Sequence, residues 1–183
     1  QSTCEEMPYN RSWALNVGVQ HAKGGFLALV DADMALPASF AKSCCAILDS
    51  GADFLRPARL LFYLNEETSR KFQKARSASV IEHVGTVTQN LPNPMVIRRD
   101  RYFSIGGHDE GFFGWGGEDV EFLDRVRQLK CCDGAFLPIV HLWHAEAPQR
   151  ASGDRNQSTL DAKMEVPASE RTKATKSLPF GQP

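Results

Sequence analysis

Two clusters of residues in this 183-residue chain could bind a divalent cation. The first consists of Asp31 and Asp33, which follow the apolar run from Phe26 to Val30 and are separated by a small alanine. Carboxylates in this position can bind a cation and the hydroxyl groups of a nucleotide, because ligands of open α/β sheets lie at the carboxyl ends of the strands. An acidic turn that merely ends a strand is the alternative, since aspartate is a common turn former.

The second cluster lies further along the chain, where His141 and His144 are three residues apart. This spacing can present two imidazoles to one centre, and imidazole is a normal ligand of Mn²⁺, Zn²⁺ and related ions. Trp143, between them, could shield such a centre from water. A short motif of this kind also fits two surface histidines that share no ligand.

A glycine-rich loop around Trp115 is the most specific feature of the sequence. Glycines at 114, 116 and 117 allow positive φ angles and close approach of a ligand, and the indole offers a flat apolar face that suits a sugar. Glu118 and Asp119 then fall in the first turn of a predicted helix, where the macrodipole stabilises ionised carboxylates. A positioned carboxylate can accept a proton from a sugar hydroxyl. The alternative is that the two acids only stabilise the helix start.

The apolar periodicity of the chain predicts an α/β protein in which helices cover the faces of a sheet. The run from Phe26 to Val30 is bounded by glycines and acidic residues, which predicts a buried parallel strand. Asp100 can cap a short helix that ends at Gly106-Gly107. Further strands are expected over 54–64, 95–97 and 135–140, and helices over 11–23, 38–50, 66–83 and 118–130.

The segment from Ala147 onward is poor in apolar side chains and contains four prolines. Such a composition does not support a packed core. We therefore expect one catalytic domain over residues 1–146, followed by a polar, disordered tail over 147–183.

Charge and cysteine content exclude several classes of protein. The 21 basic and 22 acidic side chains leave a net charge of −1, whereas nucleic-acid binding needs a clustered basic excess. The five cysteines lack the spacing of a zinc site, so we expect reduced thiols and a reducing compartment. No apolar stretch approaches the roughly 20 residues of a membrane span. We expect a cytoplasmic protein, with peripheral association at the inner membrane face and the oligomeric state left open.

Four motifs in order resemble the metal-dependent GT-A glycosyltransferases, and within them the galactosyltransferase and N-acetylgalactosaminyltransferase-like group that includes bacterial capsule and polysaccharide enzymes. The resemblance covers about residues 9–145 and implies the Rossmann-like GT-A fold. Members of this family carry additional strands before the region of Arg11, so we expect an N-terminally truncated, incomplete fold. The motifs are Tyr9–Gly18, Asp31–Asp33 with Leu36-Pro37, Gly106–Asp119 and His141–His144.

The resemblance also implies roles for individual residues. The metal, Mn²⁺ or Mg²⁺, would be bound by one carboxylate and one imidazole, with a second imidazole beside them: Asp33, His144 and His141. The nucleotide would be held by Arg11 and Asn16, and its ribose or metal-bound phosphates would contact Asp31. The donor-sugar and acceptor pocket would be shaped by Trp115, Gly116 and Glu118. Asp119 matches the catalytic base of the inverting members, whereas His108 departs from the aromatic residue, such as Phe, that is usual at its position.

These expectations together predict an inverting glycosyltransferase that moves a hexose or N-acetylhexosamine from a UDP-sugar to a saccharide acceptor. A non-catalytic fragment that binds sugar or nucleotide is one alternative. An aspartyl-phosphate hydrolase is another, because it also places an Asp-x-Asp pair after an apolar strand. That class usually has Thr, Ser or Val where this chain has Ala35, and it leaves the Trp115 loop without a role.

Overall fold

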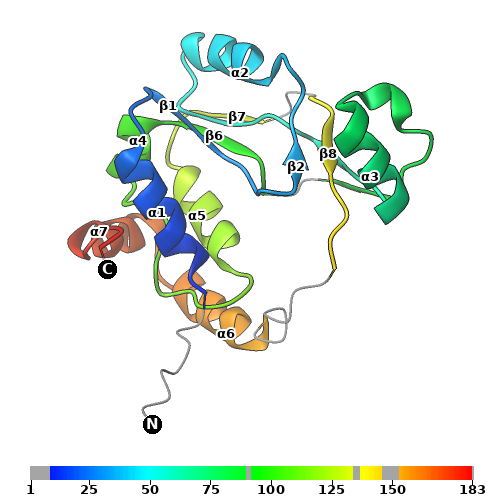
Figure 1. Ribbon diagram of the computed structural model, residues 1–183. Coiled ribbons are helices and arrows are strands. Elements are labelled where there is room, and N and C mark those ends of the chain that lie inside the picture. The colour runs from blue at the N-terminus through cyan, green and yellow to red at the C-terminus, as the bar shows by residue number, and fades with distance from the viewer. Residues whose placement is uncertain (1–8, 90–91, 134–136, 146–152, 183) are drawn as a thin grey trace. The chain divides into compact units, whose positions relative to one another are not determined.

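The computed structural model describes residues 9–89, 92–133, 137–145 and 153–182 (Figure 1). The chain forms two compact units. The first unit combines Gln1–Gly25, Arg99–Gln128 and Ala147–Pro183, and the second combines Phe26–Arg98 and Leu129–Glu146. Residues from both sides of position 146 thus share the first unit. The fold is mixed α/β, as the periodicity predicts.

All eight strands of the described residues lie in the second unit, in two four-stranded sheets. The first sheet has the order β1 (Phe26–Leu29), β6 (Met95–Arg98), β3 (Phe54–Arg56) and β7 (Cys131–Asp133). The second has the order β2 (Met34–Ala35), β8 (Ile139–His141), β4 (Leu60–Tyr63) and β5 (Thr86–Gln89). Both sheets are mixed, because β3–β7 and β4–β8 are parallel pairs and the other pairs are antiparallel.

The apolar run after Gly25 is a strand, but the prediction that it is parallel is wrong. β1 pairs with β6 in the antiparallel direction, with Phe26 opposite Arg98. Its side chains alternate, with Leu27 and Leu29 buried and Ala28 exposed. An apolar run predicts burial, whereas the direction of pairing depends on a partner strand that lies elsewhere in the sequence.

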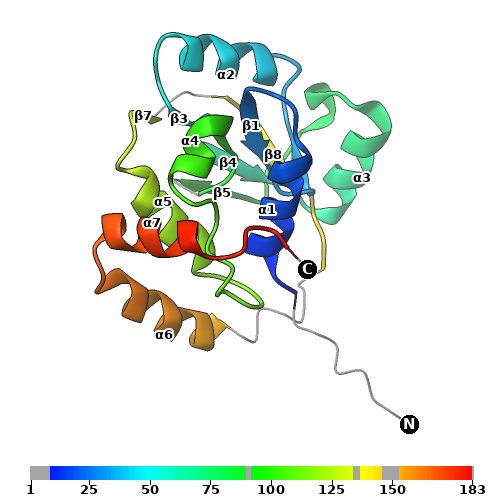
Figure 2. The same ribbon diagram turned by 90° about the vertical axis from the view of Figure 1, so that its left-hand side faces the viewer.

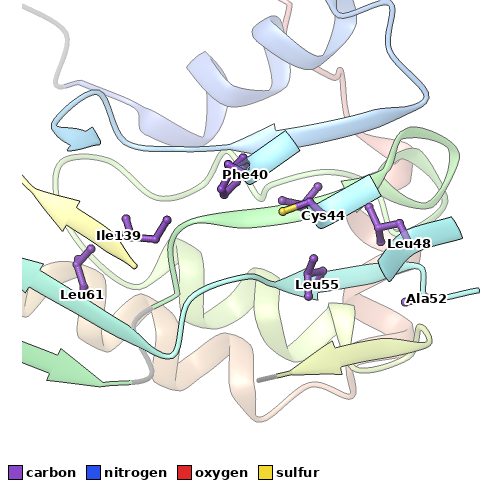
Figure 3. Close-up of a cluster of buried hydrophobic side chains, with 8 residues drawn as sticks. Phe40, Cys44, Leu48, Ala52, Leu55, Leu61 and Ile139 are labelled. Carbon is purple, nitrogen blue, oxygen red and sulfur yellow. The ribbon is translucent and has the colours of Figure 1, made fainter. Parts of the chain in front are cut away.

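The core of the second unit forms between α2 (Phe40–Asp49) and strands of both sheets (Figure 3). The helix buries Phe40, Cys44 and Leu48, which its helical period places on one face. They pack with a cluster that also contains Ala52, Leu55, Leu61, Val96 and Ile139. Each fully buried aliphatic or aromatic side chain stabilises the fold by roughly 1.5–3 kcal/mol. This core anchors β4 and β8, the strands that carry Tyr63 and His141.

The second unit also contains α3 (Glu66–Ala75) and a short 3₁₀ helix (Ala78–Val80), where one polar helix over 66–83 was expected. The helix ends where Arg76 adopts the left-handed conformation, with a φ of 48°. Asn65 caps its start, because the side-chain oxygen accepts a hydrogen bond from the backbone N–H of Thr68 at 2.8 Å.

The described part of the first unit is helical, with α1 (Arg11–His21), α4 (Arg99–Ser104), α5 (Glu118–Val126), α6 (Gly153–Met164) and α7 (Ala168–Ser177). Asn10 caps α1 by accepting a hydrogen bond from the backbone N–H of Trp13 at 2.9 Å. α4 begins at Arg99, so Asp100 lies in its first turn instead of capping it.

The structure differs from the prediction of a disordered tail, because residues 153–177 contain α6 and α7. Both helices contact α5 (Figure 2). The apolar Leu160 of α6 is buried, and α7 buries the charged Arg171 and the polar Thr175. A composition rule counts apolar residues, so it does not detect a helix that is held by buried ion pairs and hydrogen bonds.

The remaining expectations concern cysteines and membranes. Cys44, Cys45 and Cys132 are free thiols, Cys131 is exposed, and Cys4 lies outside the described residues. Among the described residues, no helix combines the length and the hydropathy that crossing a bilayer requires.

Candidate functional sites

Asp33, His141 and His144 converge in the second unit. One ligand atom from each lies within 4.8 Å of those of the other two. Asp33 Oδ2 is 3.5 Å from His141 Nε2 and 3.2 Å from His144 Nε2. The residues that the sequence suggests as metal ligands therefore form one cluster, although they lie far apart in the chain.

The pairing of β2 with β8 brings the carboxylate to the imidazoles (Figure 1). Met34 lies opposite His141 in this antiparallel pair. The backbone N–H of Leu142 donates to the carbonyl oxygen of Asp33 at 2.8 Å, which continues the pairing by one step. On the other side, the N–H of Met34 donates to Asp31 O at 3.1 Å and closes the acidic turn.

Two neighbours orient the histidines, and the sequence motifs identify neither. Tyr63 of β4 lies opposite His141 in the parallel β4–β8 pair, and its ring stacks on the imidazole at a centroid distance of 4.3 Å. The hydroxyl oxygen of Ser69, buried in α3, accepts a hydrogen bond from the backbone N–H of Trp143 at 2.8 Å. This contact anchors the backbone that leads to His144. A tyrosine in a strand and a serine in a polar helix carry no signal of such a role.

The donor atoms of the cluster fit a transition-metal ion. His144 Nδ1 lies 2.8 Å from the carbonyl oxygen of Ala145, and because a carbonyl can only accept, Nδ1 is the donor, which leaves Nε2 as the ring nitrogen that can bind a metal. Asp33 Oδ1 and His141 Nδ1 are buried without a hydrogen-bond partner among the described residues. One carboxylate with two imidazoles is a donor set for Mn²⁺, Zn²⁺ or Fe²⁺, whereas Mg²⁺ prefers oxygen ligands.

Asp31 lies beside this cluster and is oriented by a residue that sequence reasoning missed. Asn93 Nδ2 donates to Asp31 Oδ2 at 3.0 Å. Asn93 is almost fully buried, and Asp31 is partly exposed. The amide therefore holds one carboxylate oxygen in a defined direction at the surface of the unit.

The candidate base Asp119 lies in the first unit, at the start of α5. Arg11 Nη1 donates to Asp119 Oδ1 at 2.8 Å and lies 3.5 Å from Glu118 Oε1. Burial of Asp119 acts to raise its pKa, but the interactions with the neighbouring His108 and Arg11 outweigh burial and hold the pKa below its ordinary value. The carboxylate is therefore ionised near neutral pH and able to accept a proton.

Asn16 is buried at the centre of a hydrogen-bond network instead of facing a ligand. Its Nδ2 donates to His108 O at 2.9 Å and to Glu110 Oε1 at 2.6 Å. Its Oδ1 accepts from the hydroxyl of Tyr102 at 2.7 Å and from the N–H of His108 at 3.0 Å. Both donors and both acceptor sites of the amide are thus used inside the chain, an arrangement that ties α1 to residues 102–110.

His108 stands where an aromatic residue was expected, and its ring packs inside the first unit. The imidazole stacks on the ring of Phe122 at a centroid distance of 3.9 Å and is hydrogen-bonded through Nδ1 to the hydroxyl of Tyr102 at 2.8 Å. Its Nε2 lies 3.8 Å from Asp119 Oδ1. Burial lowers the pKa of His108, so the ring is neutral near pH 7.

The Trp115 loop, residues 112–117, adopts a backbone conformation that its glycines allow. Gly116 and Gly117 have φ angles of 94° and 92°, in the region that favours glycine. A Cβ at Gly117 would also lie 2.7 Å from the ring of Phe112. Trp115 is 53% exposed at the surface of the first unit. Asn156 of α6, inside the segment expected to be disordered, donates to carbonyls of this loop.

The predicted site residues thus form two groups, each within one unit. The second unit contains the cluster of Asp33, His141 and His144, with Asp31 nearby. The first unit contains Arg11, Asn16, Trp115, Gly116, Glu118 and Asp119.

Residues 94–142 match the family described as the N-terminal domain of galactosyltransferase. This stretch includes the Trp115 loop, Asp119 and His141. A Drosophila β-1,4-galactosyltransferase 7 mutant, solved with manganese, UDP-Gal and xylobiose, is similar at 18% identity with a TM-score of 0.44. That match covers 77% of this chain and 54% of the other.

The catalytic domain of Drosophila β-1,4-galactosyltransferase 7, solved with xylobiose, is similar at 17% identity and a TM-score of 0.41, over 81% of this chain and 61% of that one. This chain therefore spans less than two thirds of the length of either structure. Comparison with curated protein sequences finds no match. Over residues 94–142, the chain is similar to a galactosyltransferase domain.

Proposed function

We propose that this chain is the catalytic part of a GT-A glycosyltransferase that moves a hexose or N-acetylhexosamine from a UDP-sugar to a saccharide hydroxyl. The observation that carries the proposal is the convergence of Asp33, His141 and His144 on one centre. The galactosyltransferase match over residues 94–142 supports it from the sequence side. Assignment to bacterial capsule or polysaccharide synthesis stays a prediction from the motifs.

In this proposal, Asp33, His141 and His144 hold a Mn²⁺ ion that, when bound, stabilises the negative charge of the departing nucleoside diphosphate. Tyr63 and Ser69 keep the imidazoles in place, so the donor atoms need little rearrangement on binding. Asp31, oriented by Asn93, accepts hydrogen bonds from hydroxyl groups of the nucleotide.

Asp119 acts as the base that removes the proton of the attacking hydroxyl. Its lowered pKa keeps it ionised across the neutral range, at the expense of basicity. Arg11 holds one carboxylate oxygen and thereby orients the group. Deprotonation of a hydroxyl that attacks opposite the leaving group inverts the configuration of the anomeric carbon, and the proton remains on Asp119 until it passes to solvent.

Metal binding tests the central observation directly. We expect Mn²⁺ to bind the chain, as measured by calorimetry, and Asp33→Asn to abolish this binding, because it removes the charged ligand. Asp49→Asn, at the exposed end of α2, is the matched control and should bind Mn²⁺ normally. Normal Mn²⁺ affinity in folded Asp33→Asn would refute the proposed centre.

An assay of sugar transfer tests whether Asp119 is the catalytic base. With UDP-sugars, Mn²⁺ and a panel of saccharide acceptors, Asp119→Asn should retain Mn²⁺ and UDP binding but lose turnover by roughly 10²- to 10⁴-fold. Ordinary turnover in this variant would show that another group takes the proton. Binding without any transfer by the parent chain would favour the binding-fragment alternative. Metal-independent release of phosphate from simple phosphate esters would favour the hydrolase alternative.

A further inference from the structure

One side chain of α6 holds the backbone of the Trp115 loop. Asn156 Nδ2 donates to the carbonyl oxygens of Phe113 and Trp115, both at 3.0 Å. Asn156 is only 2% exposed, so these bonds are made out of water. The two hydrogens of one amide group therefore bridge the loop across Gly114.

The loop needs such a support because of its composition. Glycines lose more conformational entropy than other residues when they are ordered, and Gly114, Gly116 and Gly117 all have positive φ angles. A Cβ built on Gly117 would lie 3.3 Å from the backbone oxygen of Asn156, so the helix and the loop are in close contact. The bonds from Asn156 hold the backbone of Trp115 while its indole remains half exposed.

A second contact joins α6 to the residues just before the loop. Lys163 Nζ donates to Asp109 Oδ2 and lies 5.7 Å from the ring centre of Phe112. Asp109 Oδ1 accepts a hydrogen bond from the N–H of Gly111 at 2.8 Å. α6 therefore contacts the segment at two points, at either end of the stretch from Asp109 to Trp115.

We propose that Asn156 is a positioning residue for the saccharide site, and that α6 belongs to that site through the backbone of the Trp115 loop. The proposal rests on the proposed function, in which the exposed indole of Trp115 stacks on a sugar ring. A saccharide that stacks on an indole needs the ring at a set height and angle, and the loop glycines alone do not supply this restraint. Asn156 supplies it through two donors, a role that neither aspartate nor alanine can fill.

The test compares Asn156→Asp, which has the same shape but lacks the two donors, with Gln157→Ala, which changes the exposed neighbour on α6. In Asn156→Asp we expect the KM for the saccharide acceptor to rise roughly ten-fold, the value of one to two hydrogen bonds, with Mn²⁺ affinity unchanged. Gln157→Ala should match the parent. Unchanged acceptor KM in folded Asn156→Asp would overturn the proposal.

A fluorescence measurement separates this proposal from the proposed function. In a background with Trp13→Phe and Trp143→Phe, Trp115 is the remaining tryptophan of the three. Asn156→Asp should increase its quenching by acrylamide and lower its anisotropy, and Gln157→Ala should change neither. This result holds even if no transfer is detected. If Asn156→Asp does not fold, Asn156→Gln, which keeps the donors one methylene further out, should show the same changes in smaller size. Unchanged quenching and anisotropy would overturn the proposal.

Discussion

The buried charges between α5 and α7 allow a quantitative prediction of stability. Glu121 of α5 is fully buried and accepts hydrogen bonds from Arg125 Nε at 2.8 Å and Nη2 at 2.7 Å. It also accepts a hydrogen bond from Arg171 of α7. Arg125 is fully buried and Arg171 is nearly so. The Glu121 carboxylate therefore pairs with two guanidinium groups that are shielded from water. We predict that Glu121→Gln strongly destabilises the first unit.

The magnitude follows from the charge that is left behind. Removing one partner of a buried ion pair costs about 3–5 kcal/mol, because the remaining charge stays desolvated without compensation. Asp124 still pairs with Arg171, but among the residues that the structure describes Arg125 keeps only uncharged acceptors such as the carbonyl of Ile105. Compared with typical net stabilities of about 5–15 kcal/mol, this is a large share.

Urea denaturation followed by tryptophan fluorescence measures this loss. In a Trp143→Phe background, the signal comes from Trp13 and Trp115, both in the first unit. The midpoint for Glu121→Gln should fall by about 1–5 M urea for an m-value of about 1–3 kcal/mol/M. Glu67→Gln, on the exposed face of α3, is the matched control and should leave the midpoint unchanged. A midpoint for Glu121→Gln within error of the parent would refute the buried ion-pair network and the docking of α7.

Three further predictions concern the pH dependence of stability and two glycine positions. Burial holds the folded-state pKa of His108 below the ordinary value of 6.5, an effect that Arg11 and Arg125 reinforce and Asp119 opposes. The unfolded chain therefore binds more protons as the pH falls below 6.5, so the free energy of unfolding should decrease between pH 7 and 5, and decrease less in His108→Phe. A pH dependence that is identical in parent and variant would contradict this assignment. Gly107→Ala should lower the urea midpoint, because its Cβ would lie 2.1 Å from the ring of Phe180 at a φ of 63°. Gly18→Ala, with no atom within 4 Å of the new Cβ, should raise stability by about 0.5–1 kcal/mol, and a decrease would contradict the open environment.

Local pattern predicted most of the helices and indicated the candidate site residues. The apolar period of residues 38–50 predicted a helix, and the structure has α2 there, with Phe40, Cys44 and Leu48 buried. The acidic pair, the histidine pair and the glycine-rich loop were all visible as motifs, because each consists of a few residues that are close together in the sequence. Short strands such as β2 and β5 were not predicted, since segments of two to four residues with mixed polarity carry little periodicity.

The residues that support the motifs could not be found in this way. Ser69, Asn93 and Asn156 act through hydrogen bonds to groups far away in the sequence, and nothing in their neighbours marks them. The polar composition of residues 153–177 indicated disorder for a related reason. Its buried partners, such as Glu121 for Arg171, lie on another helix.

The amino-acid sequence alone determined which side chains can do chemistry, because ligand type, helix period and glycine content are local properties. The tertiary structure decided which of them meet. Asp33 reaches His141 because β2 and β8 pair in the antiparallel direction, and β1 is antiparallel because its partner is β6. Strand pairs and buried ion pairs join residues that are distant in the chain. They therefore stabilise the fold only after the backbone has brought those residues together.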